Sequence, residues 1–154
     1  MSGTVLRIGS AADHQFVAQL GARTLWDSVA PFRHADDTML EASFDRLLQF
    51  VWEQSHVLLL ALQDDRPVAF LLLLDGFPDE VTLMPQAFVA YMAVEPHHRR
   101  QGIATALLRR AEEMARERGL PYVALMVTEN NRAAQRTYKA AGYLTERRLL
   151  CKPL

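Results

Sequence analysis

The stretch that most constrains this chain is an apolar run followed by a basic turn and an amphipathic helix. Residues 87–94 (AFVAYMAV) are almost continuously apolar, as expected for a strand buried on both faces. Glu95-Pro96 ends the run, because proline has no amide hydrogen to donate to a neighbouring strand. After Gly102, apolar residues recur at helical spacing: Ile103, Leu107, Leu108, Ala111, Met114 and Ala115. The sequence therefore predicts a strand, a basic turn, a glycine and a helix, in that order.

The basic turn has the features of an anion site. The first amides of a helix lack partners within it and carry partial positive charge. Gly102 and Ala104 leave the backbone open to a phosphate, and guanidinium groups such as those of Arg99 and Arg100 bind phosphate well. The pattern favours a pyrophosphate here. The alternative is an ordinary surface turn with solvated arginines.

Two motifs in this half of the chain resemble those of a known family. Arg99-x-x-Gly102-x-Ala104, placed after an apolar strand, resembles the acetyl-CoA-binding motif of the GNAT N-acetyltransferases. Residues 131–143 (NRAAQRTYKAAGY) are similar to that family's second signature: an asparagine, an alanine three later, a tyrosine four after that, then a glycine and an aromatic residue. The resemblance extends from about residue 87 to residue 143. It implies the GNAT fold, an α+β arrangement of three α/β/α layers with helices on both faces of a mixed central β-sheet.

The resemblance also implies how acetyl-CoA is bound. In the family two neighbouring strands splay apart, and the pantetheine arm pairs with backbone groups exposed in the gap. Tyr138 matches the tyrosine that protonates the departing thiolate, although a core tyrosine on a helix face would show the same spacing. Asn131 would contact the pantetheine arm, and it could equally cap the helix that follows. The implied cofactor-binding residues are Met92, Ala93, Val94, Arg99, Arg100, Gln101, Gly102, Ile103, Ala104, Thr105 and Asn131.

The sequence assigns no residue as the base that would deprotonate the acceptor amine. Residues 87–94 include no carboxylate, and Phe88 stands where histone-type members of the family have a glutamate. Asp79, Glu80, Glu129 or a chain of water molecules could serve, or the amine could arrive neutral. The mechanism therefore departs from the histone-type pattern.

The acceptor site is expected between the first two helices, the linker that joins them and the loop at residues 75–86. This region is aromatic and acidic, through Trp26, Phe32, Asp36, Asp37 and Glu41. A small cationic or aromatic amine would suit it, whereas the alternative is a solvated helix N-terminus with favourably placed aspartates. The predicted function is acetyl-CoA-dependent N-acetylation of a primary amine, most simply of a small molecule. Acetylation of a protein or peptide amine and a catalytically silent acetyl-CoA-binding regulatory domain are the alternatives.

Composition limits the other functional classes. The 154 residues are half apolar, enough for one domain, spanning residues 1–154, with a sizeable core. A formal net charge of −1 argues against nucleic acid as the main partner. Cys151 is the single cysteine, so no intrachain disulfide can form, and we expect no metal cofactor. Residues 1–10 lack the apolar core of a signal peptide, and no apolar run is long enough to cross a bilayer, so we expect a cytoplasmic protein without a membrane partner. A homodimer is compatible with this composition.

Local patterns predict the remaining elements. Ser10 and Asp13 form a capping box that opens the first helix, which Pro31 bounds, and Asp36 or Asp37 caps the second. The further elements expected are a strand at 5–8, an antiparallel hairpin of 57–62 and 68–74, a strand at 121–127, a helix from Asn131 to Gly142 and a final strand at 143–151.

Overall fold

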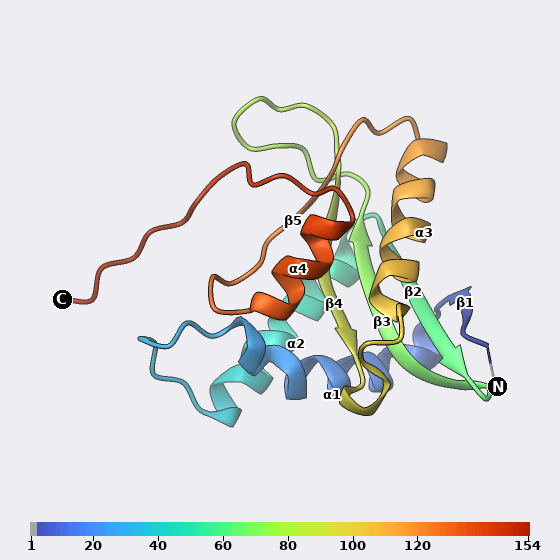
Figure 1. Ribbon diagram of the computed structural model, residues 1–154, viewed down its shortest axis with the longest axis horizontal. Coiled ribbons are helices and arrows are strands. Elements are labelled where there is room, and N and C mark those ends of the chain that lie inside the picture. Colours follow the sequence, from blue (N-terminus) through green and yellow to red (C-terminus); the bar gives the residue numbers. More distant parts are fainter. Residues whose placement is uncertain (1–2) are drawn as a thin grey trace.

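The computed structural model describes residues 3–154, and its strands form one mixed sheet with the order β1-β2-β3-β4-β5 (Figure 1). The first four strands are antiparallel neighbours, whereas β5 runs parallel to β4. The strands are β1 (Val5–Ile8), β2 (His56–Gln63), β3 (Arg66–Leu74), β4 (Ala87–Val94) and β5 (Val123–Leu125). The mixed sheet confirms the predicted α+β class.

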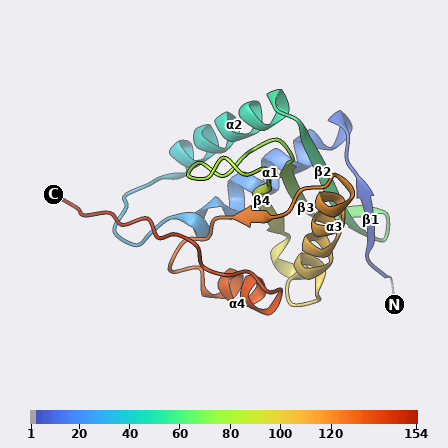
Figure 2. The same cartoon turned by 90° about the horizontal axis from the view of Figure 1, so that it is seen from above.

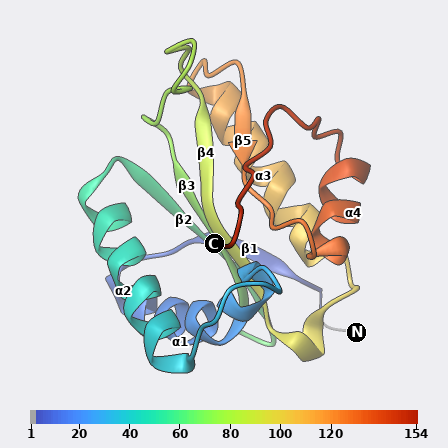
Figure 3. The ribbon, with the colours of Figure 1, turned by 90° about the vertical axis from the view of Figure 1, so that its left-hand side faces the viewer.

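Helices cover both faces of this sheet, as Figures 2 and 3 show. One face is covered by α1 (His14–Thr24) and α2 (Asp37–Glu53), and the other by α3 (Ile103–Glu117), with α4 (Arg132–Ala140) beside α3. Three short 3₁₀ turns complete the described elements: η1 (Ala11–Asp13), η2 (Leu25–Ser28) and η3 (Pro96–His98). The arrangement is the three-layer α/β/α fold that the motifs imply.

Alternate side chains of the central strands divide the core into two halves. Leu58, Leu60 and Phe70 pack with the α1 and α2 side, whereas Leu59 and Leu71 pack with the α3 side. All five side chains are at most 4% exposed. Because both faces of the sheet are covered, these strands are continuously apolar in sequence rather than alternating.

The contact between α1 and α2 depends on Gly21. A Cβ atom at this position would lie 2.0 Å from the ring of Phe44 on α2. The absent side chain therefore lets the Phe44 ring pack directly against the α1 backbone, where both residues are buried.

The predicted helix starts are confirmed, with one change of length. Ser10 and Asp13 make the capping box, and the Asp36 carboxylate accepts a hydrogen bond of 2.8 Å from the amide of Met39. The first helix begins as the 3₁₀ turn η1 and α1 ends at Thr24, well before Pro31. The chain then tightens into η2, which becomes part of the site described below.

The predicted final strand at 143–151 is wrong, and the strand expected at 121–127 is shortened to β5. Residues 144–154 have no strand partner among residues 3–154, and Figure 1 shows them leading away from the sheet. Arg147 pairs instead with Asp79 and Glu80 in the loop that follows β3, which draws the segment away from β5. A strand needs a neighbour, and within residues 3–154 the segment has none.

Candidate functional site

A gap opens between β4 and β5 after three residue pairs. β5 pairs with β4 only along Ala87–Val89. At the same point the register of β4 against β3 shifts, because Tyr91 faces Leu72 and Val89 faces Leu73, which leaves Ala90 as the extra residue. Such a bulge bends and twists a strand and is common beside functional sites. Beyond it, β4 pairs with β3 alone within the described chain, so its β5 side is a free backbone edge. Backbone groups alternate between the two sides of a strand, and the amide of Glu95 bonds to the Val68 carbonyl of β3. The groups of Met92 and Val94 therefore face the gap, whereas those of Ala93 face β3, which corrects the expectation for Ala93.

The turn after β4 leads into an open helix N-terminus. Arg100 and Gly102 adopt positive φ angles of 64° and 79°. Gly102 caps α3 without a side-chain hydrogen bond, and the first helical bond runs from the amide of Ala106 to the Gly102 carbonyl at 3.0 Å. The amides of Ile103, Ala104 and Thr105 therefore have no acceptor within the helix. A Cβ atom at Gly102 would meet nothing within 4 Å, so there is room for a ligand in front of these amides.

A small polar network fixes this turn to the β2–β3 hairpin. Gln63 at the end of β2 donates from Nε2 to Oε1 of Gln101 at 3.0 Å, and its Oε1 lies 2.8 Å from Nδ1 of His98. Gln63 was not predicted as a site residue, because it lies 38 positions before Gln101 and outside any motif.

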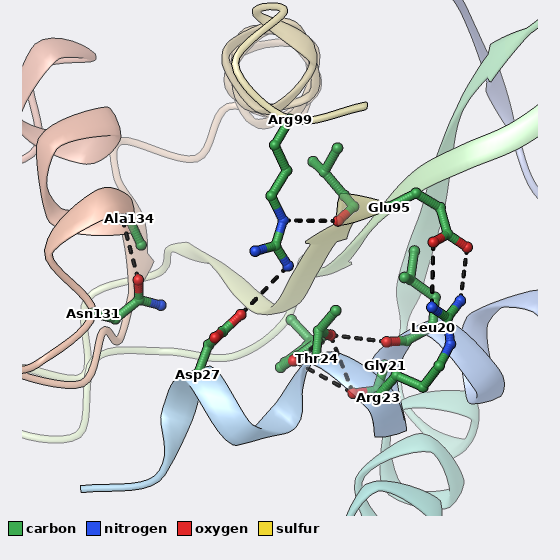
Figure 4. Close-up of polar contacts among 11 residues, drawn as sticks. Leu20, Gly21, Arg23, Thr24, Asp27, Glu95, Arg99, Asn131 and Ala134 are labelled. Carbon is green, nitrogen blue, oxygen red and sulfur yellow. Dashed lines mark hydrogen bonds and ion pairs between the residues drawn. The ribbon is translucent and has the colours of Figure 1, made fainter. Parts of the chain in front are cut away.

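The side chain of Arg99 lies against the end of β4. Its Nε donates to the Val94 carbonyl at 3.2 Å, and its Nη2 lies 3.4 Å from Oδ2 of Asp27 on η2 (Figure 4). Arg100 is exposed on the turn itself. The two arginines expected to act together thus differ, because Arg99 contacts Val94 and Asp27 whereas Arg100 is exposed. Asp27 is a site residue that sequence reasoning missed.

Two further contacts join η2 to the other side of the gap. Thr128, in the loop between β5 and α4, donates to the Ser28 carbonyl at 2.9 Å. Asn130 in the same loop donates to the Val29 carbonyl at 3.5 Å. Since Asp27 contacts the β4 side and Ser28 the β5 side, η2 spans the mouth of the gap on the α1 face of the sheet.

Tyr91, beside the bulge, is a second residue that the motifs did not indicate. Its hydroxyl lies 2.8 Å from Oγ1 of Thr24 on α1, and its ring packs edge-on against Phe44. Burial raises the pKa of the Tyr91 phenol to about 12. The neutral hydroxyl thereby ties α1 to the strand that borders the gap.

The two residues predicted on the fourth helix lie on the other side of the gap. Oδ1 of Asn131 accepts a hydrogen bond of 3.3 Å from the amide of Ala134, so Asn131 caps α4 (Figure 4). Tyr138 is half-buried against the α3 side of the core, with its ring centroid 6.0 Å from that of Tyr143. Burial raises the pKa of the Tyr138 phenol, which keeps its proton in place at neutral pH.

The acidic side chains proposed as bases have structural partners. Asp79 accepts hydrogen bonds from the Thr82 amide at 2.7 Å and hydroxyl at 2.6 Å, and it also pairs with Arg147. The Thr82 hydroxyl contributes most to lowering the pKa of Asp79 to about 2. Glu80 pairs with the same arginine at 3.0 Å. These carboxylates hold the loop after β3, and a carboxylate of such low pKa is a poor base.

Some acidic side chains near the second helix also form hydrogen bonds within the protein. Asp36 caps α2, and Oδ1 of Asp37 accepts a hydrogen bond of 2.8 Å from the Trp26 indole. Trp26 and Phe32 still expose 44% and 46% of their surface, so an aromatic surface remains beside η2.

Within residues 3–154, no helix combines the length and hydropathy that crossing a membrane requires, and no group of three or more potential ligands could hold a metal ion.

Comparisons with known proteins agree with this geometry. The chain is 43% identical over 74 residues to "Acetyl transferase GW6a" of Oryza sativa subsp. japonica, a stretch that covers 47% of this chain and 18% of that protein. A solved structure described as an acetyl transferase from Pyrococcus furiosus matches with a TM-score of 0.84 at 23% identity, covering 99% of this chain and 100% of the other. The aminoglycoside N-acetyltransferase AAC(6')-Iy, solved with CoA, matches with a TM-score of 0.72 at 16% identity, over 100% of this chain and 96% of the other.

The chain also matches a family model. The model of the "Acetyltransferase (GNAT) family" matches residues 22–143, which include β4, the basic turn, α3 and both sequence motifs. The chain belongs to the GNAT acetyltransferase family.

Proposed function

We propose that this protein binds acetyl-CoA in the gap between β4 and β5 and transfers its acetyl group to a primary amine, most simply that of a small molecule. The observation that carries the proposal is a free strand edge leading directly to an open helix N-terminus. An extended amide-containing arm can pair with the first, and a pyrophosphate can bind the second. CoA combines both groups in one molecule, and its thioester supplies the acyl group.

The basic turn would bind the phosphates. The amides of Ile103, Ala104 and Thr105 have no acceptor within α3, and Arg100 on the same turn is exposed. Arg99 occupies the Val94 carbonyl, a group that the pantetheine arm would use. We therefore expect the Arg99 side chain to leave Val94 and Asp27 and to turn toward the phosphates when the cofactor binds.

The reacting end would lie deeper in the gap, near the β4 bulge. The free amide of Met92 could polarise the acetyl carbonyl, and removing an oxyanion donor of this kind typically costs about 3 kcal/mol in the barrier. Tyr138 would hold the proton for the departing sulfur at its hydroxyl oxygen, because its raised pKa keeps the phenol neutral.

The acceptor would approach from the α1 face, across η2. Trp26 and Phe32 supply exposed aromatic surface there, and the Asp27 carboxylate lies at the same turn. This combination suits a small amine with an apolar or aromatic body. Acetylation of a protein or peptide amine is the second candidate.

Thiol release from acetyl-CoA in the presence of an amine panel tests this function. The panel contains aromatic monoamines, polyamines, and peptides with free N-terminal or lysine amines, and binding of acetyl-CoA is measured by calorimetry in the same buffer. Steady release with a small amine supports the proposal, and release with peptides alone replaces the small acceptor by a protein one. Binding without release for any amine would indicate a silent cofactor-binding domain, and absence of binding would refute the site.

A further inference from the structure

Three side chains of β4 face the acceptor side of the gap, and none of them carries a carboxylate or an imidazole. Phe88, Ala90 and Tyr91 are half-buried and pack toward the α1 and α2 side of the sheet. Ala90 is the bulged residue at which the gap opens, so an acceptor that approaches from the α1 face would meet these side chains. Only Tyr91 among them can ionise, and burial raises the pKa of its phenol to about 12.

A cluster of three phenylalanines extends this apolar surface outward. The ring centroid of Phe88 lies 5.5 Å from that of Phe77 in the loop after β3, and the Phe77 centroid lies 6.2 Å from that of Phe50 on α2. Phe77 and Phe50 are 40% and 42% exposed. An ammonium group that leaves water for this surface loses its hydration, and attraction to ring faces is weaker than that loss. The phenylalanine cluster therefore favours an uncharged amine.

The acids on the elements around this surface have cationic partners or are exposed. The ion pairs are Glu95 with Arg23 of α1, Asp27 of η2 with Arg99, Asp79 and Glu80 with Arg147, and Glu129 of the β5–α4 loop with Arg132. The acidic residues of α2 are all exposed, β5 has no charged residue, and α4 contributes the phenol of Tyr138. Only Asp27 would lose its partner when Arg99 turns toward the phosphates, and its contact with Arg99 lies at the Val94 end of β4 rather than at the bulge (Figure 4).

Given the proposed function, on which this inference rests, we infer that the acceptor is a weakly basic primary amine, largely uncharged at neutral pH, with an apolar body that packs on the phenylalanine cluster. Aromatic amines and peptide α-amines share this chemistry. An α-amine with a pKa of ~7.8 is neutral in roughly one molecule in seven at pH 7, against roughly one in 2,500 for a lysine-type amine with a pKa of ~10.4.

Transfer to such an amine balances its protons without a separate base. The nitrogen lone pair attacks the acetyl carbonyl carbon, and the C–S bond breaks as the C–N bond of the amide forms. The departing sulfur takes the proton of Tyr138, and the nitrogen, which carries one proton too many after the attack, returns a proton to the Tyr138 oxygen. The net change moves one proton from nitrogen to sulfur and yields an amide and a thiol.

The pH dependence of kcat/KM for three amines tests the inference. The probes are an aromatic monoamine, a lysine-free dipeptide with a free N-terminus, and an alkylamine that carries the same aromatic ring, each measured from pH 6 to 9. Both phenols of the site keep their protons over this range, because burial raises their pKa values. The aromatic amine should give a flat profile, and the dipeptide should level off near its own pKa of ~7.8. The alkylamine should rise about tenfold per pH unit throughout.

The outcomes separate this inference from the function on which it rests. An inflection at one common pH for all three amines would reveal a base on the protein and overturn the inference, and so would a larger kcat/KM for the alkylamine than for the dipeptide at pH 7. Transfer to the aromatic amine alone identifies a small-molecule source, and transfer to the dipeptide a peptide source; both support it. Asp27→Asn should leave all three profiles unchanged, and a shifted profile would overturn it. Absence of transfer to any amine would refute the proposed function and the inference together.

Substitutions at Phe88 test whether the phenylalanine cluster faces the acceptor. Phe88→Glu places a carboxylate in the apolar surface and should raise kcat/KM for the alkylamine relative to the dipeptide by about tenfold or more at pH 7, because the charged amine gains a partner. Phe88→Leu keeps the surface apolar and should keep the natural preference. Circular dichroism and acetyl-CoA affinity check the fold, and Phe77→Glu, at an exposed loop position, makes the same test if Phe88→Glu does not fold. An unchanged preference in the folded glutamate variant would overturn the inference.

Discussion

Placing a carboxylate at Gly102 should weaken acetyl-CoA binding by roughly 30-fold to 150-fold while leaving the fold intact. A side chain at this position would enter the open space in front of the α3 amides, where we place the pyrophosphate. At about 5 Å and an effective dielectric constant of ~40, the aspartate repels each phosphate charge by roughly 1.7 kcal/mol. After screening by salt, a total of about 2–3 kcal/mol remains, which weakens binding roughly 30-fold to 150-fold.

The matched control for Gly102→Asp is Gly119→Asp at the other end of α3. Gly119 has a φ of 70° against 79° for Gly102, and a Cβ atom there also meets nothing within 4 Å. Both variants therefore bear the same backbone strain, on the order of 1 kcal/mol, and should show similar losses in melting temperature. Calorimetric titration with acetyl-CoA should separate them, with near-natural affinity for Gly119→Asp. Equal affinity in the two folded variants would show that the phosphates do not bind at this turn.

Three further changes test other parts of the structure. Tyr138→Phe should lower kcat by about 10²–10⁴-fold and leave the affinity for acetyl-CoA unchanged. The control Tyr143→Phe removes a buried hydroxyl that has no partner among residues 3–154, and it should retain full activity. A fall in kcat of less than about threefold for Tyr138→Phe removes Tyr138 from the mechanism. The pKa of Asp79 is lowered to about 2 in the folded protein, against ~3.9 in the unfolded chain. The ionised carboxylate therefore stabilises the fold above pH ~3.9, and this stabilisation is lost as the pH falls toward 2. Between these pH values, melting curves should show a smaller loss of stability for Asp79→Asn than for the natural sequence. Gly21→Ala places a methyl group against the Phe44 ring and should destabilise the fold by about 1–3 kcal/mol in urea titrations, and an unchanged midpoint would contradict the packing described for α1 and α2.

Sequence reasoning succeeded where the signal is local. The apolar run of β4 agrees with the observed strand at both ends, and α3 begins at Ile103, directly after the glycine that the motif contains. The capping box of Ser10 and Asp13 and a cap at Asp36 or Asp37 were also predicted, because each is a short-range pattern of side chain and amide, and the structure has Asp36 as the cap. The family and the fold class followed from motifs made of the same kind of local signal.

The residues that complete the site could not be predicted, because they meet only through the tertiary structure. Asp27 and Arg99 are separated by 72 positions, and Gln63 and Gln101 by 38. Nothing in the neighbourhood of Asp27 distinguishes it from an ordinary acidic residue near a helix end. Even the conformation of Arg99 depends on this partner, since the motif alone suggests a side chain directed at phosphate.

The predicted final strand shows a different limit of sequence reasoning. Residues 143–151 (YLTERRLLC) mix apolar and charged residues and were expected to form a strand, and in the structure they form neither helix nor strand. A strand, however, is defined by the neighbour with which it pairs, and a single sequence does not reveal whether that neighbour lies in the same chain. Arg147 shows why the choice is not local, because its partners Asp79 and Glu80 lie 68 and 67 positions earlier. Those ion pairs direct the segment away from β5, so its leucines remain exposed among the described residues.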